Sequence, residues 1–91
     1  MSTEIKSEIG ADVKKGTGMR IILYNDEVNT FEHVIYCLIR YCGHDPVQAE
    51  QCASIVHANG KIDIKRGSLD EIVPINNALV YEKLLTEIEA G

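Results

Sequence analysis

An apolar strand, an acidic turn and an amphipathic helix follow one another without interruption near the start of the chain. Residues 19–24 (Met-Arg-Ile-Ile-Leu-Tyr) form a short apolar run that predicts a buried strand. Residues 25–27 (Asn-Asp-Glu) end the run, because Asn and Asp favour turns and hydrogen-bond to nearby backbone amides. A helix is expected to begin at Asn29, with Glu32 at the spacing of a capping box. Apolar side chains then recur at helical spacing over residues 31–42.

A second helix and a second strand are marked by clear start and stop signals. Asp45 suits the N-cap of this helix, and Pro46 suits its first position. The helix should end at residues 59–60 (Asn-Gly), after a buried stripe that includes Ala49, Cys52, Ala53 and Val56. Residues 61–66 alternate polar and apolar side chains, which predicts a strand with one buried face.

A third helix should open at Ser68, which forms a capping box with Glu71. The apolar side chains expected to point inward are Leu69, Ile72 and Val73. Pro74 lies inside this pattern and predicts a kink or a break, because proline removes one helical hydrogen bond and clashes with the preceding turn. The helix is expected to resume as far as residue 83, and residues 85–90 can form a final strand.

The resulting order of elements is β-α-α-β-α-β. A chain of 91 residues makes one domain. Helices on one face of a small, three-stranded, mostly antiparallel sheet make this an α+β fold, a two-layer sandwich. Residues 1–18 are polar and are closed by Gly-Thr-Gly, so we expect a flexible N-terminal arm there and a core domain over residues 19–91.

Composition excludes several classes of function. The net charge is −5 and no basic stripe is present, which argues against nucleic acid as a partner and, more weakly, against anionic membranes. No apolar run is long enough to span a bilayer, and the first 18 residues do not read as a signal peptide. Three cysteines within predicted helices favour reduced thiols in a cytoplasm. An acidic chain suits a cationic partner, such as a free amino group.

Three hydrogen-bond acceptors are candidates for a binding site. Asn25, Asp26 and His57 offer an amide oxygen, a carboxylate and a neutral imidazole. If they converge, they match the three donors of an ammonium group, and the charge of Asp26 strengthens its bond. The plainer interpretation is that Asn-Asp after a strand is only a turn and that a single His at a helix end has no special role.

The residues give less support to a metal site or to a catalytic site. His33 and Cys37 lie four apart on a helix, but no Cys-x-x-Cys pair accompanies them and His33 lies on a different face from Cys42, so no metal site is expected. Nothing marks a thiol as an activated nucleophile. Asp26 and His57 have no accompanying nucleophile or phosphate-binding loop. We therefore expect no catalytic residue and no cofactor. A small enzyme is the least favoured of the functions considered.

Two segments together resemble the ClpS family of proteolytic adaptors. The first is residues 23–34 (LYNDEVNTFEHV), with a helix opening at Thr30, and the second is residues 56–61 (VHANGK). The resemblance implies that Asn25, Asp26 and His57 hold the α-amino group of a substrate's first residue. It also implies an apolar pocket for the first side chain, lined by Leu23, Asn29, Phe31, Val34, Ala53 and Val56.

Two pocket positions differ from typical members of that family. Phe31 stands where Met is usual, and Phe is stiffer and larger. Ala53 stands where a longer apolar residue is usual, which would deepen the pocket. Together they predict selection for large unbranched or aromatic first residues.

The resemblance further implies a ClpS-like fold and a function. The chain would be an adaptor, not an enzyme, that binds bulky hydrophobic N-degrons and delivers their proteins to a Clp-type AAA+ ATPase-protease. It would work as a cytoplasmic monomer, and residues 1–18 would promote hand-over of the substrate. Typical members dock the ATPase through an acidic-polar-Lys patch, whereas residues 70–77 (DEIVPINN) contain no Lys. The alternative is a protein-interaction domain of the same fold that no longer reads amino termini.

Overall fold

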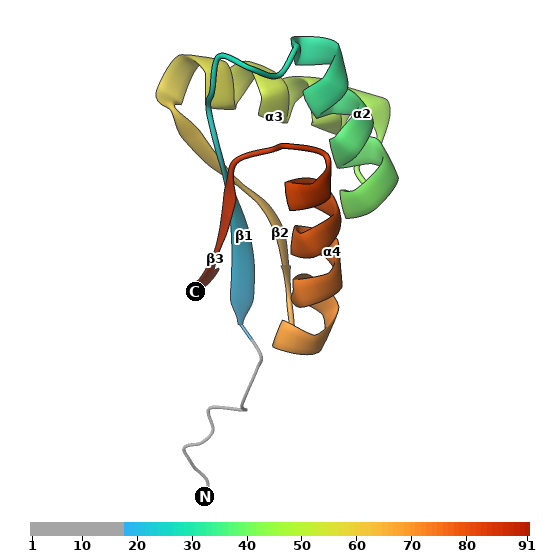
Figure 1. The fold of residues 1–91 in the computed structure, drawn as a ribbon, viewed down its shortest axis with the longest axis vertical. Coiled ribbons are helices and arrows are strands. Elements are labelled where there is room, and N and C mark those ends of the chain that lie inside the picture. The colour runs from blue at the N-terminus through green and yellow to red at the C-terminus, as the bar shows by residue number, and fades with distance from the viewer. Residues whose placement is uncertain (1–17) are drawn as a thin grey trace, which may run out of the picture.

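The structure is a computed structural model that describes residues 18–91, so the expected arm lies outside the described residues except for Gly18. The order of elements is the expected β-α-α-β-α-β (Figure 1). The strands and helices are β1 (Met19–Tyr24), α2 (Phe31–Cys42), α3 (Pro46–Asn59), β2 (Lys61–Gly67), α4 (Leu69–Tyr81) and β3 (Thr86–Ala90). The start of β1 at Met19 coincides with the predicted start of the core domain.

β1 is the central strand of an antiparallel three-stranded sheet with the order β2-β1-β3. Tyr24 at the end of β1 pairs with Lys61 at the start of β2, and the register shifts between Ile21 and Ile22. On the other side, Leu23 pairs with Thr86 at the start of β3. The last residues of β1 are therefore held from both sides, which fixes the direction in which the chain leaves the sheet.

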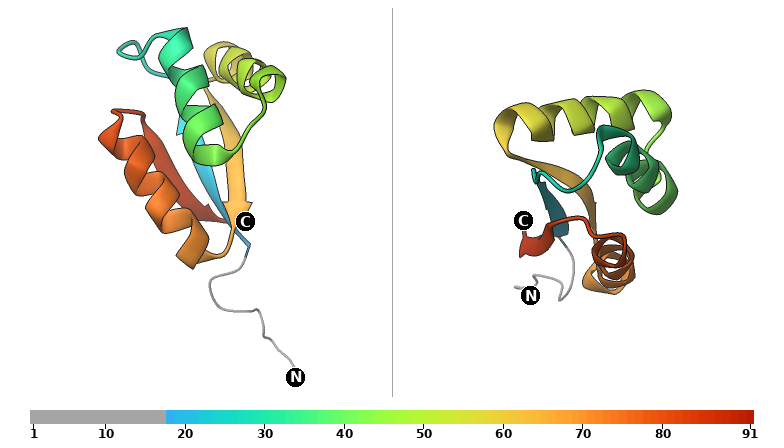
Figure 2. Two further views of the ribbon diagram at one scale, coloured as in Figure 1. Left: turned by 90° about the vertical axis from the view of Figure 1, so that its right-hand side faces the viewer. Right: turned by 45° about the horizontal axis from the view of Figure 1, so that its top comes forward.

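The three helices cover one face of the sheet, which confirms the predicted α+β sandwich (Figure 2). Alternate residues of β1 point toward the helices, because successive strand side chains face opposite sides. The largest fully buried side chains come from both layers and are Ile21, Leu23, Leu38, Ile72 and Leu79. On the opposite face, Arg20 pairs with Asp63 at 3.5 Å and with Glu89 at 3.2 Å.

Two of the three predicted helix starts are confirmed, and one is displaced. The side chain of Asp45 accepts from the Gln48 N–H, and Ser68 and Glu71 form the full capping box. The first helix, in contrast, is capped by Thr30, whose side-chain oxygen accepts from the His33 N–H at 3.0 Å. The prediction of Asn29 as the cap was wrong because its side chain forms hydrogen bonds elsewhere, as described below.

The predicted break at Pro74 was wrong, because α4 is one continuous helix from Leu69 to Tyr81. Pro74 lacks the N–H that would bond to the carbonyl of Asp70. Both residues are exposed, so water can reach that carbonyl. The helix therefore continues through the proline, and it ends two residues before the expected position.

The inward face of α4 is also narrower than predicted. Ile72 is fully buried, whereas Leu69 is 41% and Val73 38% exposed, so the prediction that these two point inward was wrong.

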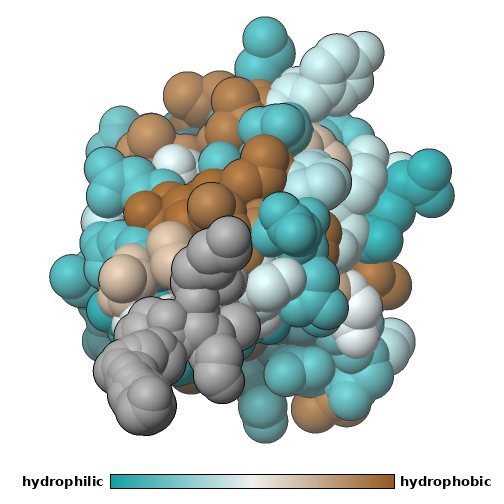
Figure 3. All heavy atoms as spheres, turned by 90° about the horizontal axis from the view of Figure 1, so that it is seen from below, coloured by the Kyte–Doolittle hydropathy of each residue, from teal (hydrophilic) through white to brown (hydrophobic). Residues whose placement is uncertain are grey.

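Seen from below, the surface is mostly hydrophilic with a hydrophobic patch near its middle (Figure 3). None of the helices within residues 18–91 has the length and apolar character needed to cross a membrane. The thiols of Cys37, Cys42 and Cys52 are free and buried, as predicted.

Candidate functional site

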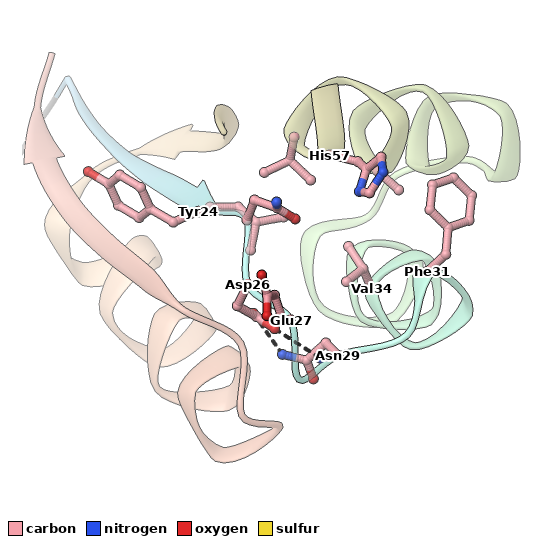
Figure 4. Close-up of a pocket in the computed structure, with 11 residues that line it drawn as sticks. Tyr24, Asp26, Glu27, Asn29, Phe31, Val34 and His57 are labelled. Carbon is pink, nitrogen blue, oxygen red and sulfur yellow. Dashed lines mark hydrogen bonds between the residues drawn. The ribbon is translucent and has the colours of Figure 1, made fainter. Parts of the chain in front are cut away.

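All nine residues predicted for the binding site line one pocket of about 470 Å³ at the end of β1. The pocket lies between the loop of residues 25–30, the first turns of α2 and the last turns of α3. Its lining residues are Leu23, Tyr24, Asn25, Asp26, Glu27, Asn29, Phe31, Val34, Ala53, Val56 and His57. Tyr24 and Glu27 are the two that sequence reasoning missed, and both flank residues that it found. The ring of Tyr24 points away from the pocket (Figure 4), and its hydroxyl donates to Glu87 at 3.0 Å.

The end of α3 is held next to the loop by the backbone. Gly60 terminates the helix with a φ of 94°, a left-handed conformation that favours glycine. Its carbonyl accepts the Asn25 N–H at 2.8 Å. His57 lies one helical turn before this contact, so the helix end and the loop carry His57 and Asn25 to the same pocket. Both side chains are exposed and have no hydrogen-bond partner among the described residues.

The carboxylate of Asp26 is held in one orientation by three hydrogen bonds. Oδ1 accepts the backbone N–H groups of Val28 at 2.7 Å and of Asn29 at 2.9 Å, and Oδ2 accepts the Asn29 side-chain amide at 2.9 Å (Figure 4). Burial alone would raise the pKa of Asp26, but the bonds from Asn29 and Val28 outweigh it and hold the pKa below its ordinary value of 3.8. The group is therefore ionised at neutral pH.

Three bonds leave part of the carboxylate unused. An ionised carboxylate has about four lone-pair directions. Two are occupied on Oδ1 and one on Oδ2, so one direction on Oδ2 is free for a ligand. The turn interpretation of Asp26 is thus confirmed, and it is compatible with a binding role because the turn is what orients the free lone pair.

Asn29 connects the loop to a distant part of the chain. Its side-chain amide donates both to Asp26 Oδ2 and to the backbone carbonyl of Lys83, each at 2.9 Å. Lys83 has a φ of 75°, so its carbonyl is presented from a left-handed turn between α4 and β3. No sequence signal links residues 54 positions apart, so this positioning role of Asn29 could not be predicted.

Replacing Asn29 with Ala should loosen the loop. The change removes two side-chain hydrogen bonds, one of them to a charged group, and should lower the free energy of unfolding by about 1–3 kcal/mol. Urea denaturation measures this loss. Asn77→Ala is the matched control, since Asn77 is exposed on α4. Equal stability of the two variants would contradict the connecting role.

The rest of the pocket is an apolar wall. Leu23, Ala53 and Val56 are buried, and Val34 is half-buried. Ala53 packs outside the hydrophobic core cluster that contains Leu23 and Val56, so its small side chain faces the pocket. Phe31 is 40% exposed and lies with His57 on the helical side of the pocket, across from Asp26 (Figure 4). The arrangement offers acceptors and negative charge beside an apolar surface.

The lining carries no activated nucleophile. None of the 11 lining residues is Ser, Thr, Cys or Lys. Burial raises the pKa of both Cys37 and Cys42 to about 11, so these thiols stay protonated at neutral pH. The pocket therefore presents a negative charge and hydrogen-bond acceptors beside an apolar surface, with no reactive thiol among its lining residues.

Comparison with known proteins decides the family. The family model described as ATP-dependent Clp protease adaptor protein ClpS matches residues 14–79. The chain belongs to the ClpS family. A solved structure of Agrobacterium tumefaciens ClpS2 bound to L-phenylalaninamide has the same fold, with a TM-score of 0.76 and 16% sequence identity over 85% of this chain and 100% of that chain. A search of curated proteins finds no match.

The ClpS match includes every residue of the pocket and continues along α4 to Leu79. It therefore extends beyond the two segments that carried the resemblance in the sequence. Members of the ClpS family are adaptors of the Clp protease and not enzymes, so this chain is a ClpS-family adaptor whose partners are the Clp protease and its substrates.

Proposed function

We propose that this ClpS-family protein binds the free N-terminal residue of substrate proteins, with preference for bulky hydrophobic residues, and delivers them to a Clp-type AAA+ ATPase-protease. It acts without catalysis, as a cytoplasmic monomer. The observation that carries the proposal is the convergence of all nine predicted residues on one pocket, with a fixed carboxylate on one side and an apolar wall on the other.

The polar groups of the pocket fit an α-amino group. An ammonium group has three donors, and Asn25, Asp26 and His57 each offer an acceptor. Asp26 contributes its free lone pair on Oδ2 together with a full negative charge, because its pKa is low. Charge-assisted hydrogen bonds are roughly twice as strong as neutral ones. Asp26 should therefore provide most of the discrimination between a free and a blocked amino terminus.

The apolar wall fits the first side chain of the substrate. Complete burial of a large apolar side chain contributes about 1.5–3 kcal/mol. L-phenylalaninamide, the compound bound to Agrobacterium tumefaciens ClpS2, combines a free amino group with one aromatic side chain. A ligand of that kind matches both halves of the pocket described here.

Phe31→Met should change which first residue is preferred without removing the need for a free amino group. Met adapts its shape, whereas the Phe ring is rigid and stands at the mouth of the pocket. We expect the ratio of affinities for Phe-first and Leu-first peptides to change by about threefold to tenfold, or roughly 1 kcal/mol. Fluorescence anisotropy measures the ratio. Tyr36→Met is the control, since Tyr36 is an exposed aromatic on α2 outside the pocket. An unchanged ratio would show that Phe31 does not determine which first residue is preferred.

NMR titration with L-phenylalaninamide tests where recognition takes place. The backbone amides of residues 25–34 and 53–60 should shift on addition of the compound, and N-acetyl-phenylalaninamide should leave them unchanged. Equal shifts with both compounds, or shifts elsewhere only, would support the interaction domain that no longer reads amino termini.

Delivery is tested separately with a reporter protein that begins with Phe. A Clp-type AAA+ ATPase-protease should degrade this reporter faster when the chain is present, and a reporter beginning with Ala should show no acceleration. Degradation of both reporters at rates independent of the chain would contradict the delivery step while leaving recognition intact.

A further inference from the structure

A second cluster of polar side chains lies outside the pocket, where α2 meets the turn after α4. His33 and Cys37 are one helical turn apart on α2, and Glu82 joins them from the C-cap of α4. The ring nitrogen Nε2 of His33, the sulfur of Cys37 and the carboxylate of Glu82 all lie within 4.8 Å of one another. The sequence argument against a metal site compared His33 and Cys37 with Cys42, and it left out Glu82 because nothing in the sequence brings Glu82 to them.

Two of the three separations between donor atoms are close to those around one tetrahedral ion, and the third is within 4.8 Å. His33 Nε2 is 3.6 Å from Cys37 Sγ and 3.7 Å from Glu82 Oε1. In tetrahedral zinc sites, bond lengths of about 2.0–2.3 Å place neighbouring ligand atoms about 3.3–3.6 Å apart. Only small side-chain adjustments would therefore be needed to bring the three groups onto a single ion.

A second layer of contacts orients the carboxylate of Glu82. The hydroxyl of Tyr41 donates to Oε2 at 2.6 Å, which leaves Oε1 as the oxygen directed toward His33. Outer partners of this kind commonly fix metal ligands in place. Cys37 is fully buried, whereas the side chains of His33 and Glu82 are 31% and 22% exposed, so solvent reaches two of the three residues.

We propose that His33, Cys37 and Glu82 form a binding site for a divalent transition-metal ion of the zinc class. One nitrogen, one sulfur and one oxygen ligand suit zinc and not Mg²⁺ or Ca²⁺, which require oxygen ligands. Three protein ligands leave a fourth position for water or another small ligand. The bound ion would fasten α2 to the turn whose next residue, Lys83, holds Asn29 through its carbonyl.

The proton balance of binding follows from the groups present. Cys37 binds as a thiolate, so its thiol proton is released to solvent. In the free protein, His33 Nε2 lies 3.0 Å from the backbone carbonyl of Glu82. Binding through Nε2 breaks any hydrogen bond to that carbonyl and keeps the ring proton on Nδ1. A purely structural role for the cluster, with His33 donating to that carbonyl, predicts no metal binding.

Co²⁺ is the probe of choice, because it binds in tetrahedral sites and its absorption spectrum depends on which ligands surround it. Titration of the reduced, full-length chain should give intense visible bands and a thiolate-to-cobalt charge-transfer band that saturate at one ion per chain. Zn²⁺ should displace the cobalt and remove both bands. The absence of the charge-transfer band from the unmodified chain would overturn the proposal.

Variants identify the ligands. Cys37→Ala should abolish the charge-transfer band, and His33→Gln and Glu82→Gln should each weaken Zn²⁺ binding more than tenfold in calorimetry. Cys52→Ala is the matched control, because Cys52 is another buried free thiol outside the cluster. Glu82→Gln, on a partly exposed turn, still tests the site if Cys37→Ala does not fold. Undiminished Zn²⁺ binding in the ligand variants, or equal loss in Cys52→Ala, would contradict the assignment.

Discussion

Asp26→Asn should weaken the binding of a peptide with a free amino terminus by about tenfold to a hundredfold. The substitution removes the negative charge and turns a charge-assisted bond into a neutral one, a loss of about 1.5–3 kcal/mol. The loss should be similar for every first residue, because Asp26 lies on the polar side of the pocket. Fluorescence anisotropy with labelled Phe-first and Leu-first peptides measures the loss of affinity and shows whether it is the same for both first residues.

Asn is a sharper replacement than Ala at this position. It keeps an oxygen that can accept the N–H groups of Val28 and Asn29, so the loop is preserved better than in Asp26→Ala. Asp70→Asn is the control for charge, since Asp70 is exposed on α4 and far from the pocket in the sequence. Unchanged affinity in Asp26→Asn, with both variants folded, would show that the carboxylate does not read the amino group.

The same substitution has a pH signature. The folded-state pKa of Asp26 is depressed, so its contribution to stability is complete above the ordinary value of 3.8 and is lost as the pH falls through the lower folded-state value. The difference in free energy of unfolding between the wild type and Asp26→Asn should therefore be constant near neutrality and shrink in acid. If this difference stayed constant as the pH fell below 3.8, the hydrogen bonds to the ionised Asp26 carboxylate would not contribute to stability.

Ala53→Met should remove most of the room for large first side chains. Ala53 is buried in the wall of the pocket and packs outside the core cluster, so a longer side chain extends into the space that the ligand needs. Peptides beginning with Phe or Trp should bind about tenfold more weakly or worse, since up to 1.5–3 kcal/mol of side-chain burial is at stake. Affinities across a series of first residues provide the measurement.

The control for this change is Ala58→Met, which adds the same side chain at an exposed position of the same helix. Ala58→Met should leave all affinities unchanged. Thermal unfolding of Ala53→Met should show only a modest loss of stability, because the added atoms enter an open pocket instead of the core. A uniform loss of affinity, independent of first side-chain size, would mean that Ala53 does not shape a side-chain pocket.

The predictable part of the fold is the part decided by short-range chemistry. Asp45 and Ser68 cap their helices through N–H groups three residues away, and these contacts can be read from the sequence. Asn29 has the same local signature but bonds instead to Asp26 and to the carbonyl of Lys83, so the cap moves to Thr30. The prediction failed where a contact between distant parts of the chain competed with a local one.

The site shows the same division. Two short segments, residues 23–34 and 56–61, carry eight of the nine predicted pocket residues, and Ala53 lies just before the second segment on the same helix. The backbone contact between Asn25 and Gly60 joins those segments. The grouping of Glu82 with His33 and Cys37 depends on how α4 packs beside α2, which no local pattern records.

Fluorescence anisotropy with labelled peptides that begin with Phe, Leu, Tyr, Trp, Ile or Ala, each with a free and an acetylated amino terminus, tests the central claim most directly. The structure predicts tight binding of the bulky unbranched and aromatic termini, weak binding of Ala, and loss of all binding on acetylation. Binding that is indifferent to acetylation, or no binding of any peptide, would contradict recognition of the amino terminus and leave a ClpS fold that serves as an interaction domain.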